Sequence, residues 1–251
     1  MAAGLFVLIY SFKCVMGKRE GFIVGGDYVR NLTYFPWAGF LLFNGYDESY
    51  GCGSSILNQD ILITAANCFT FNDFFEITAT VGHKDKYQGY VYRVEAYKLH
   101  SEWDIFTMSH DIALCKLKKK LYLRHYVKRL ILMVRPPKEK TAELVGWGAI
   151  EEIRFKDTKL IKTVYQKLWT REKCKEVLYE LPEGTICGGE ENGSDFPSSG
   201  DTGSGLVIRR LIIVGVYSYK DIRVSRSLGV YTNVSYFYDW IKRSSRQLKC
   251  D

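Results

Sequence analysis

Three short segments of this chain hold side chains whose types could do chemistry. Thr64-Ala-Ala-Asn-Cys68 holds a carboxamide, Asp111-Ile-Ala-Leu114 holds a carboxylate, and Gly200-Asp-Thr-Gly-Ser-Gly205 holds a hydroxyl between glycines. A hydroxyl becomes a strong nucleophile only beside a general base. A carboxamide takes up no proton near neutral pH, so Asn67 cannot be that base. The remaining candidate bases are the four histidines, His83, His100, His110 and His125.

The elements that must position these segments have the pattern of strands. Short apolar runs recur between turn signals, and the chain holds 15% aromatic residues, 22 glycines and only 5 prolines. This composition and spacing favour an all-β sandwich or barrel. The last stretch differs, because Phe237, Trp240, Ile241 and Leu248 recur near helical spacing. We therefore predict a C-terminal amphipathic helix over 236–250.

Composition and charge exclude several classes of protein. The 251 residues are 47% apolar and 25% charged, which is ordinary for a globular chain and excludes a disordered or fibrous one. Lys and Arg total 35 and Asp and Glu total 28, a net charge of +7. This basic excess is too small to imply a nucleic-acid partner, and we expect none.

In order along the chain, these segments resemble the chymotrypsin/trypsin family of serine proteases from Ile23 to Ile241. The other segments that carry the resemblance are Ile23-Val-Gly-Gly26, Gly146-Trp-Gly148, Gly229-Val-Tyr-Thr232 and Trp240-Ile241. The resemblance implies an all-β, trypsin-like fold with two six-stranded antiparallel β-barrels and a C-terminal α-helix. The active site would lie in the cleft between the barrels.

The expected domain organisation follows from this resemblance. Residues 1–17 form a signal peptide and 18–22 a short propeptide-like segment, ahead of a protease-like domain over 23–251. The first barrel is expected over about 23–125 and the second over about 140–235. A basic segment at roughly 125–140, which contains Pro136-Pro137, joins the two barrels, and we call it the connector.

Two of the three catalytic positions of the family are substituted here. In that family a serine attacks the peptide carbonyl, a histidine takes its proton, and an aspartate orients the histidine. The resemblance places Asp111 at the aspartate, Asn67 at the histidine and Thr202 at the serine. Loss of the base slows such an enzyme about 10⁶-fold, and the β-methyl of threonine stiffens χ1. His110 adjoins Asp111, but neighbours on a strand point to opposite faces, so we expect no histidine to replace the base.

We expect the oxyanion hole of the family to be retained and its primary specificity pocket to be altered. By resemblance the oxyanion hole uses the N–H groups of Gly200 and Thr202, and the retained glycine permits the turn. Phe196 aligns with the pocket base, where it would partly fill the pocket and could not pair with Lys or Arg. Lys220 is predicted to project over the pocket entrance. The other pocket positions are Ser218, Tyr219 and Gly229.

The activation switch of the family pairs a newly freed N-terminal amine with the aspartate before the nucleophile. The corresponding residues, Ile23 and Asp201, are both present. Phe22 precedes Ile23 where an activator of trypsin type would need Lys or Arg. The switch is therefore either idle or operated by a protease that prefers aromatic residues.

The cysteine count is odd, at seven. The resemblance implies disulfides Cys52–Cys68 and Cys174–Cys187, and Cys14 would leave with the signal peptide. Cys115 lies in an apolar strand and is expected to be a buried free thiol. Cys250 is left to pair with another chain, to pair with Cys14 if that residue is retained, or to stay free.

The N-terminal segment and three sequons indicate a secreted, extracellular glycoprotein. The apolar run 2–12 is shorter than the about 20 residues that span a bilayer, so we expect a signal peptide and no membrane insertion. The alternative is a buried N-terminal strand. Asn31, Asn192 and Asn233 begin Asn-x-Ser/Thr sequons, which are glycosylation acceptors in secreted proteins.

Basic side chains of the connector and the C-terminal helix are expected to lie on adjoining surfaces. They could form a face that binds a heparin-like polyanion, or a solvated basic face without a partner. We expect no cofactor and no metal, because 83–87, the loop that binds calcium in some family members, offers one carboxylate. The six residues of the expected anion-binding face are Lys128, Arg129, Lys242, Arg243, Arg246 and Lys249.

Three functions remain open on the sequence. The first is a secreted, inactive serine protease homologue that acts by binding a protein, as a cofactor, decoy or regulator in a proteolytic or immune pathway. The second is a weak or unconventional serine-type endopeptidase that uses Thr202. The third is a binder of heparin-like polyanions.

Overall fold

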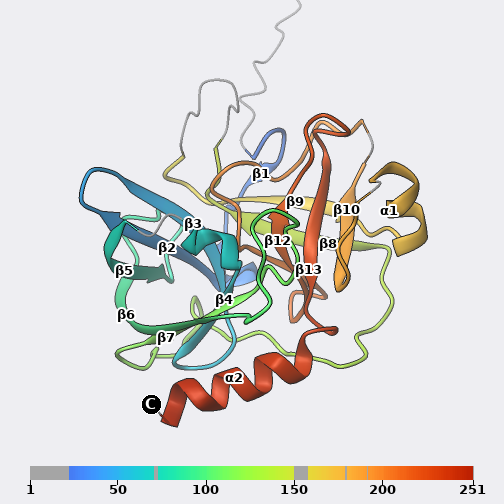
Figure 1. The fold of residues 1–251 in the computed structure, drawn as a ribbon. Helices are drawn as coiled ribbons and strands as arrows, with labels where there is room; N and C mark the ends of the chain where they lie inside the picture. The colour runs from blue at the N-terminus through green and yellow to red at the C-terminus, as the bar shows by residue number, and fades with distance from the viewer. Residues whose placement is uncertain (1–22, 71–72, 150–157, 179, 191, 251) are drawn as a thin grey trace, which may run out of the picture.

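The computed structural model describes residues 23–70, 73–149, 158–178, 180–190 and 192–250, which form two antiparallel sheets side by side (Figure 1). The predicted signal peptide 1–17 and the segment 18–22 lie outside the described residues. The strands are β1 (Asp27–Tyr28), β2 (Ala38–Gly45), β3 (Ser49–Ile56), β4 (Ile61–Thr64), β5 (Phe74–Val81), β6 (Tyr90–Leu99), β7 (Ala113–Leu117), β8 (Thr141–Gly146), β9 (Lys162–Lys167), β10 (Thr185–Gly189), β11 (Gly205–Ile208), β12 (Ile212–Tyr219) and β13 (Leu228–Asn233). The helices are η1 (Leu32–Tyr34), η2 (Ala66–Phe69), α1 (Arg171–Val177) and α2 (Tyr238–Cys250).

The first sheet is a closed barrel in the order β2-β3-β4-β7-β6-β5. Its core strands are short apolar runs, and β4 is buried along its whole length because it pairs with β3 and β7 and is covered on both faces. Leu41, Phe43, Ile63 and Leu114 are fully buried inside it. Closure removes the free sheet edges, so the barrel is a rigid base for the loops at its end.

The second sheet has seven strands in the order β1-β9-β8-β11-β12-β13-β10. A bridge between Leu168 and Gly188 links its last strand back to the end of β9, so the sheet curls into an open barrel. The expected all-β, trypsin-like fold with a C-terminal helix is thus confirmed. The second barrel differs from the expected six strands, because the short strand β1 adds a seventh at the edge of β9. The expected start of the first barrel at residue 23 differs from the structure, because Asp27 pairs with Thr163 of the second sheet.

A tight turn divides one long apolar run into β11 and β12. Arg209 and Arg210 have φ values of 51° and 52°, the left-handed conformation that a two-residue hairpin turn of type I′ requires. Glycine or asparagine usually occupies such positions. Here ion pairs hold the two arginines, since Arg209 contacts Glu139 at 2.7 Å and Arg210 contacts Glu143 at 3.1 Å.

Helix α2 returns the end of the chain to the first barrel, where it packs against β6 and β7 (Figure 1). It begins at Tyr238, two residues later than the predicted start at 236. The carboxamide of Asn233 accepts hydrogen bonds from the N–H groups of Ser235 and Tyr236, which fixes a turn before the helix. No helix in the described part of the chain is long and apolar enough to cross a bilayer.

Both disulfides implied by the resemblance are present. Cys52–Cys68 joins β3 to η2, and Cys174–Cys187 joins α1 to β10. Cys115 is the free cysteine among the described side chains, and burial raises the pKa of its thiol to about 12. Cys14 and the side chain of Cys250 lie outside what the structure describes, so their pairing stays a prediction.

Candidate functional site

Asn67 is held at the mouth of the first barrel by η2, which follows β4 directly. The next residue, Cys68, is tied to β3 by its disulfide. The Thr64 hydroxyl donates to the Gly53 carbonyl at 2.7 Å and fixes the end of β4 against β3. The position of the Asn67 side chain is therefore set by covalent and hydrogen-bonded contacts on both sides.

Asn67 and Asp111 are brought together from separate parts of the chain. The Asn67 backbone N–H donates to Asp111 Oδ1 at 2.7 Å, and Asn67 Nδ2 donates to Asp111 Oδ2 at 2.9 Å. The same amide nitrogen donates to the Ser218 carbonyl at 3.1 Å. Both hydrogens of the carboxamide are thus used as donors. The geometry that would orient a histidine is kept, with a group that has no basic nitrogen.

The Asp111 carboxylate is fully enclosed. Burial raises its pKa to about 6, and hydrogen bonds from the Ser218 hydroxyl and from Asn67 partly oppose that rise. The Ser218 hydroxyl donates to Asp111 Oδ2, and the Thr232 hydroxyl donates to the Asp111 carbonyl at 2.6 Å. Residues of both sheets therefore hold this aspartate.

Thr202 lies between two glycines with positive φ, Gly200 at 90° and Gly203 at 87°. A Cβ on Gly203 would lie 2.1 Å from Thr64 Oγ1 and 2.3 Å from the Gly53 carbonyl oxygen, so only glycine fits there. The Thr202 carbonyl accepts from the Gly53 N–H at 2.7 Å. Within the described residues, the Thr202 hydroxyl makes no hydrogen bond, and none joins it to Asn67.

One hydrogen bond orients the peptide that precedes Gly200, a residue predicted for the oxyanion hole. The Ser199 carbonyl accepts from the Ala149 N–H at 2.6 Å, which leaves the Gly200 N–H on the opposite side of that peptide. Among the described residues, no hydrogen bond uses the N–H group of Gly200 or Thr202. Two free N–H donors beside one another are what an oxyanion hole supplies.

Asn67, Gly200 and Thr202 line one cleft with a volume of about 590 Å³. Its opposite wall is the hairpin between β2 and β3, which contributes acidic residues that the sequence analysis did not single out. Nothing in their spacing marks them, because they face the cleft only after the hairpin folds over η2. The acidic residues of the hairpin are Asp47 and Glu48, and Asp73, directly before β5, also lines the cleft.

Phe196 and Lys220, two residues predicted for the specificity pocket, contact each other. Phe196 is 7% exposed, and Lys220 Nζ lies 4.1 Å from the centroid of its ring. Lys220 Nζ also donates to the Pro197 carbonyl at 3.1 Å. A carbonyl and an aromatic face thus satisfy the half-buried ammonium. The prediction that Lys220 projects over the pocket entrance stays a prediction. At the wall, Gly229 pairs with Gly188 of β10.

Asp201 is fully buried behind Thr202. Its Oδ1 accepts from the Gly148 N–H at 2.8 Å and its Oδ2 from the Ser198 N–H at 2.9 Å. Burial raises the Asp201 pKa to about 6, opposed by these N–H groups and by the charge of Lys220. A Cβ at Gly148 would lie 2.3 Å from the carboxylate, which explains a glycine at that position.

No hydrogen bond joins the two residues of the predicted activation pair in the described part of the chain. Ile23 is fully buried in the core of the second sheet, and its neighbour Val24 accepts from the Phe196 N–H at 3.0 Å. Within the described residues no hydrogen bond links Ile23 to Asp201. The pairing expected from the resemblance stays a prediction for a chain that begins at Ile23.

None of the four histidines lines the cleft that holds Asn67. His100 and His110 stack with ring centroids 4.6 Å apart, against Phe237 and the start of α2. His83 interacts with the backbone of its own loop. The expectation that no histidine stands in for the missing base agrees with these positions.

The sequon asparagines differ in environment. In two of them the hydroxyl donates to the asparagine carboxamide oxygen at 2.8 Å, namely Thr33 to Asn31 and Ser235 to Asn233. Asn31 and Asn192 are exposed, and Asn233 is half-buried. Glycosylation stays a prediction at all three. Among the described residues, no group of three or more His, Cys, Asp or Glu side chains is placed to hold a metal ion.

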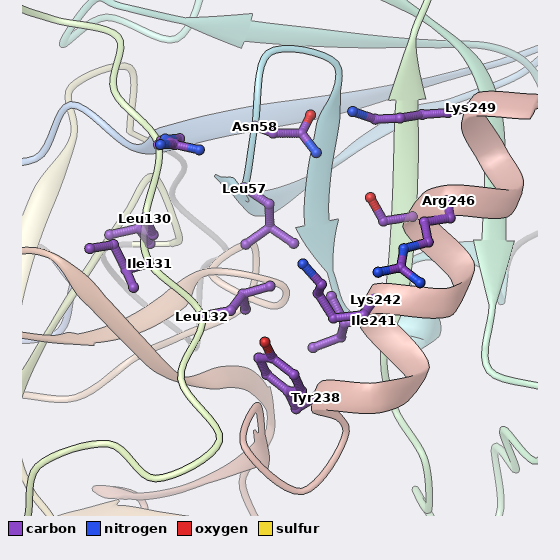
Figure 2. A pocket seen from close by; sticks show the side chains of 12 residues that line it. Leu57, Asn58, Leu130, Ile131, Leu132, Tyr238, Ile241, Lys242, Arg246 and Lys249 are labelled. Atoms are coloured by element: carbon purple, nitrogen blue, oxygen red, sulfur yellow. The ribbon is translucent and has the colours of Figure 1, made fainter.

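The six residues of the expected anion-binding face do not all line the same cavity. Four of its six residues line one groove between α2 and the connector, and Lys128 and Arg243 do not (Figure 2). The four that line it are Arg129, Lys242, Arg246 and Lys249.

Comparisons with known proteins agree on one family. The family model described as Trypsin matches residues 23–241. Hypodermin-B of Hypoderma lineatum is 30% identical, over 96% of this chain and 97% of its own length. Granzyme B of Rattus norvegicus is 28% identical, over 97% and 99%. A crystal structure of scabies mite inactivated protease paralogue S-D1 matches with a TM-score of 0.78 and 22% identity, covering 89% of this chain and 97% of that one.

Proposed function

This chain belongs to the trypsin family of serine proteases, and we propose that it is an inactive member that acts by binding a protein. The observation that carries the proposal is the use of Asn67. Its carboxamide donates to Asp111 and to the Ser218 carbonyl, at the position where the family places a histidine. A side chain with no basic nitrogen cannot take a proton from Thr202.

The contacts of Lys220 support the same proposal independently. A trypsin-like protease holds the residue before the scissile bond in its specificity pocket, and we propose that Lys220 and Phe196, which contact each other, fill that pocket here. A substrate side chain would have to displace the Lys220 ammonium from the Pro197 carbonyl. Loss of substrate positioning lowers the rate even where chemical groups are intact.

A further argument comes from a protein of the same fold. The scabies mite chain is named an inactivated protease paralogue, so the fold has a named precedent for a member of this kind. A fold retained without its chemistry still offers loops and surfaces for binding. We propose a role as cofactor, decoy or regulator in a proteolytic or immune pathway.

We further propose that the protein is secreted and acts outside the cell. Two disulfides are formed, and disulfides persist in oxidising compartments. The N-terminal apolar run and the three sequons support the same compartment.

Two alternative functions each have an observation in their favour. Free N–H groups at Gly200 and Thr202 favour a weak endopeptidase that uses the Thr202 hydroxyl. The convergence of four basic side chains on one groove favours a binder of heparin-like polyanions. We rank both alternatives below the main proposal. The endopeptidase lacks a base, and a bound polyanion would leave the apolar residues of the groove without a partner.

An active-site phosphonate tests the main proposal. The chain is prepared with Ile23 as its first residue, beside active trypsin as the positive control. We expect no covalent label, because no base activates Thr202. A chain with Asn67→His and Thr202→Ser together should still hydrolyse a panel of peptide substrates poorly, because Lys220 and Phe196 still fill the pocket.

The contrary results are clear for each arm. Labelling of Thr202 in the unaltered chain, located by mass spectrometry, refutes the inactive assignment. Rapid hydrolysis by the double variant refutes the argument from the pocket.

A further inference from the structure

The groove between α2 and the connector has an apolar floor. We call the α2 groove the cavity of about 510 Å³ that lies between this helix and the segment 129–132. Leu57, Leu132, Tyr238 and Ile241 gather along its floor (Figure 2). These side chains come from the end of β3, the connector and the helix, so the floor exists only when the three meet.

The rim of the α2 groove is basic. Arg129, in the segment 129–132, lines the groove. Lys242, Arg246 and Lys249 reach it from one face of α2 (Figure 2). Lys249 Nζ pairs with Asp60 Oδ1 at 3.2 Å. Among the described residues, the side chains of the other three make no ion pair or hydrogen bond. Their charges are therefore available to a ligand.

A second cavity extends the groove. Its volume is about 320 Å³, and it shares Arg129 and Lys249 with the first. It adds Lys120, which also has no counter-charge in the described part of the chain. Asp60 is the sole acidic residue that lines either cavity, against five cations. The combined groove thus has a strong positive charge over an apolar floor.

We propose that the α2 groove binds an acidic segment of a protein partner, with leucine- or phenylalanine-like side chains between the carboxylates. The inference rests on the proposed binding role and names the surface and the chemistry of the partner. Carboxylates complement the unpaired cations, and apolar side chains cover the floor. A sulfated saccharide would satisfy the cations and leave the floor exposed.

The test selects a phage-displayed library of 12-residue peptides on the full chain. Two charge variants are compared with the unaltered protein. Arg129→Ala with Lys242→Ala removes one arginine and one lysine from the groove. Lys128→Ala with Arg243→Ala removes the same two residue types from neighbouring surface outside it.

We expect the selected peptides to combine acidic and large apolar residues. Their Kd, measured by fluorescence anisotropy, should weaken at least tenfold on the groove variant and less than twofold on the matched control. Ile131→Ser removes a half-exposed apolar side chain of the groove, and should weaken binding at least threefold. Leu211→Ser, at a similarly exposed apolar side chain outside the groove, should leave binding unchanged.

Two results would overturn the inference. The first is selection of peptides without acidic residues, or of peptides that bind all variants equally. The second is a heparin tetrasaccharide whose binding is lost only in the groove variant, while no acidic, apolar peptide is selected. That outcome would assign the groove to a polyanion. Neither result depends on the phosphonate label, so the groove and the loss of catalysis are tested separately.

Discussion

At the scale of single residues, Asn67 can donate a hydrogen bond to the aspartate as a catalytic histidine does, but it cannot accept a proton. A histidine in this family donates one ring N–H to the aspartate and accepts a proton on the other nitrogen. Asn67 Nδ2 supplies the donor to Asp111 at 2.9 Å, and its other atom is a weakly basic carbonyl oxygen. The buried carboxylate therefore stays satisfied, and the substitution need not disturb the fold.

The pH dependence of stability reports on this buried carboxylate. The Asp111 pKa is raised from 3.8 to about 6, so the folded chain binds this proton more tightly than the unfolded chain. The resulting stability is fully present below about pH 4 and is lost as the pH rises through 6. Between pH 4 and 7, this group should lower the free energy of unfolding of the unaltered chain by about 3 kcal/mol. Asp111→Asn should abolish this part of the pH dependence.

Urea denaturation across that pH range measures the effect. Asp201 has a similarly raised pKa, so part of the pH dependence should persist in the variant. An equal slope for variant and parent would show that Asp111 ionises normally when folded. Asp47→Asn, at an exposed residue, controls for the loss of one carboxylate from the chain.

At the scale of elements, the docking of α2 depends on Phe237, the buried residue directly before the helix. Phe237 is 4% exposed and contacts the rings of His100 and His110 beside β6 and β7. Trp240 adds a further contact with His100. The helix is thus attached to the first barrel although its chain continues from the second, and it helps hold the two together.

Truncation of this contact should be costly. Phe237→Ala removes a buried aromatic ring and should lower the free energy of unfolding by about 3 to 5 kcal/mol. The adjacent Tyr236 is 55% exposed, so Tyr236→Ala should cost less than about 1 kcal/mol. Guanidinium denaturation of the two variants measures both values, and equal losses would contradict the proposed docking of α2.

At the scale of the whole molecule, two sheets with separate disulfides enclose a cleft that both supply. Cys52–Cys68 lies in the first half and Cys174–Cys187 in the second. Hydrogen bonds from Thr232 to Asp111 and from Gly53 to Thr202 cross between the halves. Hydrogen bonds between the halves and a disulfide in each half therefore fix the walls of the cleft.

Processing and glycosylation can be tested on the intact protein. Expressed with its full N-terminus in a eukaryotic secretory host, the chain should appear in the medium and begin at Lys18. Enzymatic removal of N-glycans should lower its mass, because Asn31 and Asn192 are exposed. A triple variant with Asn31→Gln, Asn192→Gln and Asn233→Gln should show no mass change. Retention of the protein inside the cells would contradict the secreted assignment.

Much of the fold and the chemistry of the site could be predicted from local features. Short apolar runs and glycine-rich turns indicate strands, and the period of the last stretch indicates α2. The inability of Asn67 to act as a base is a property of its functional group and needs no coordinates. The two disulfides follow from the resemblance, because the cysteines occupy matching positions.

What only the tertiary structure decided depends on contacts between distant parts of the chain. The Lys220 side chain has four rotatable bonds, and the Phe196 ring and the Pro197 carbonyl decide where its ammonium lies. Likewise β1 joins the second sheet because its partner is β9, more than a hundred residues later. The α2 groove arises where a helix, a connector and a strand end meet. The amino-acid sequence by itself determined that Asn67 cannot act as a base, and long-range packing decided which side chains meet at the cleft and at the α2 groove.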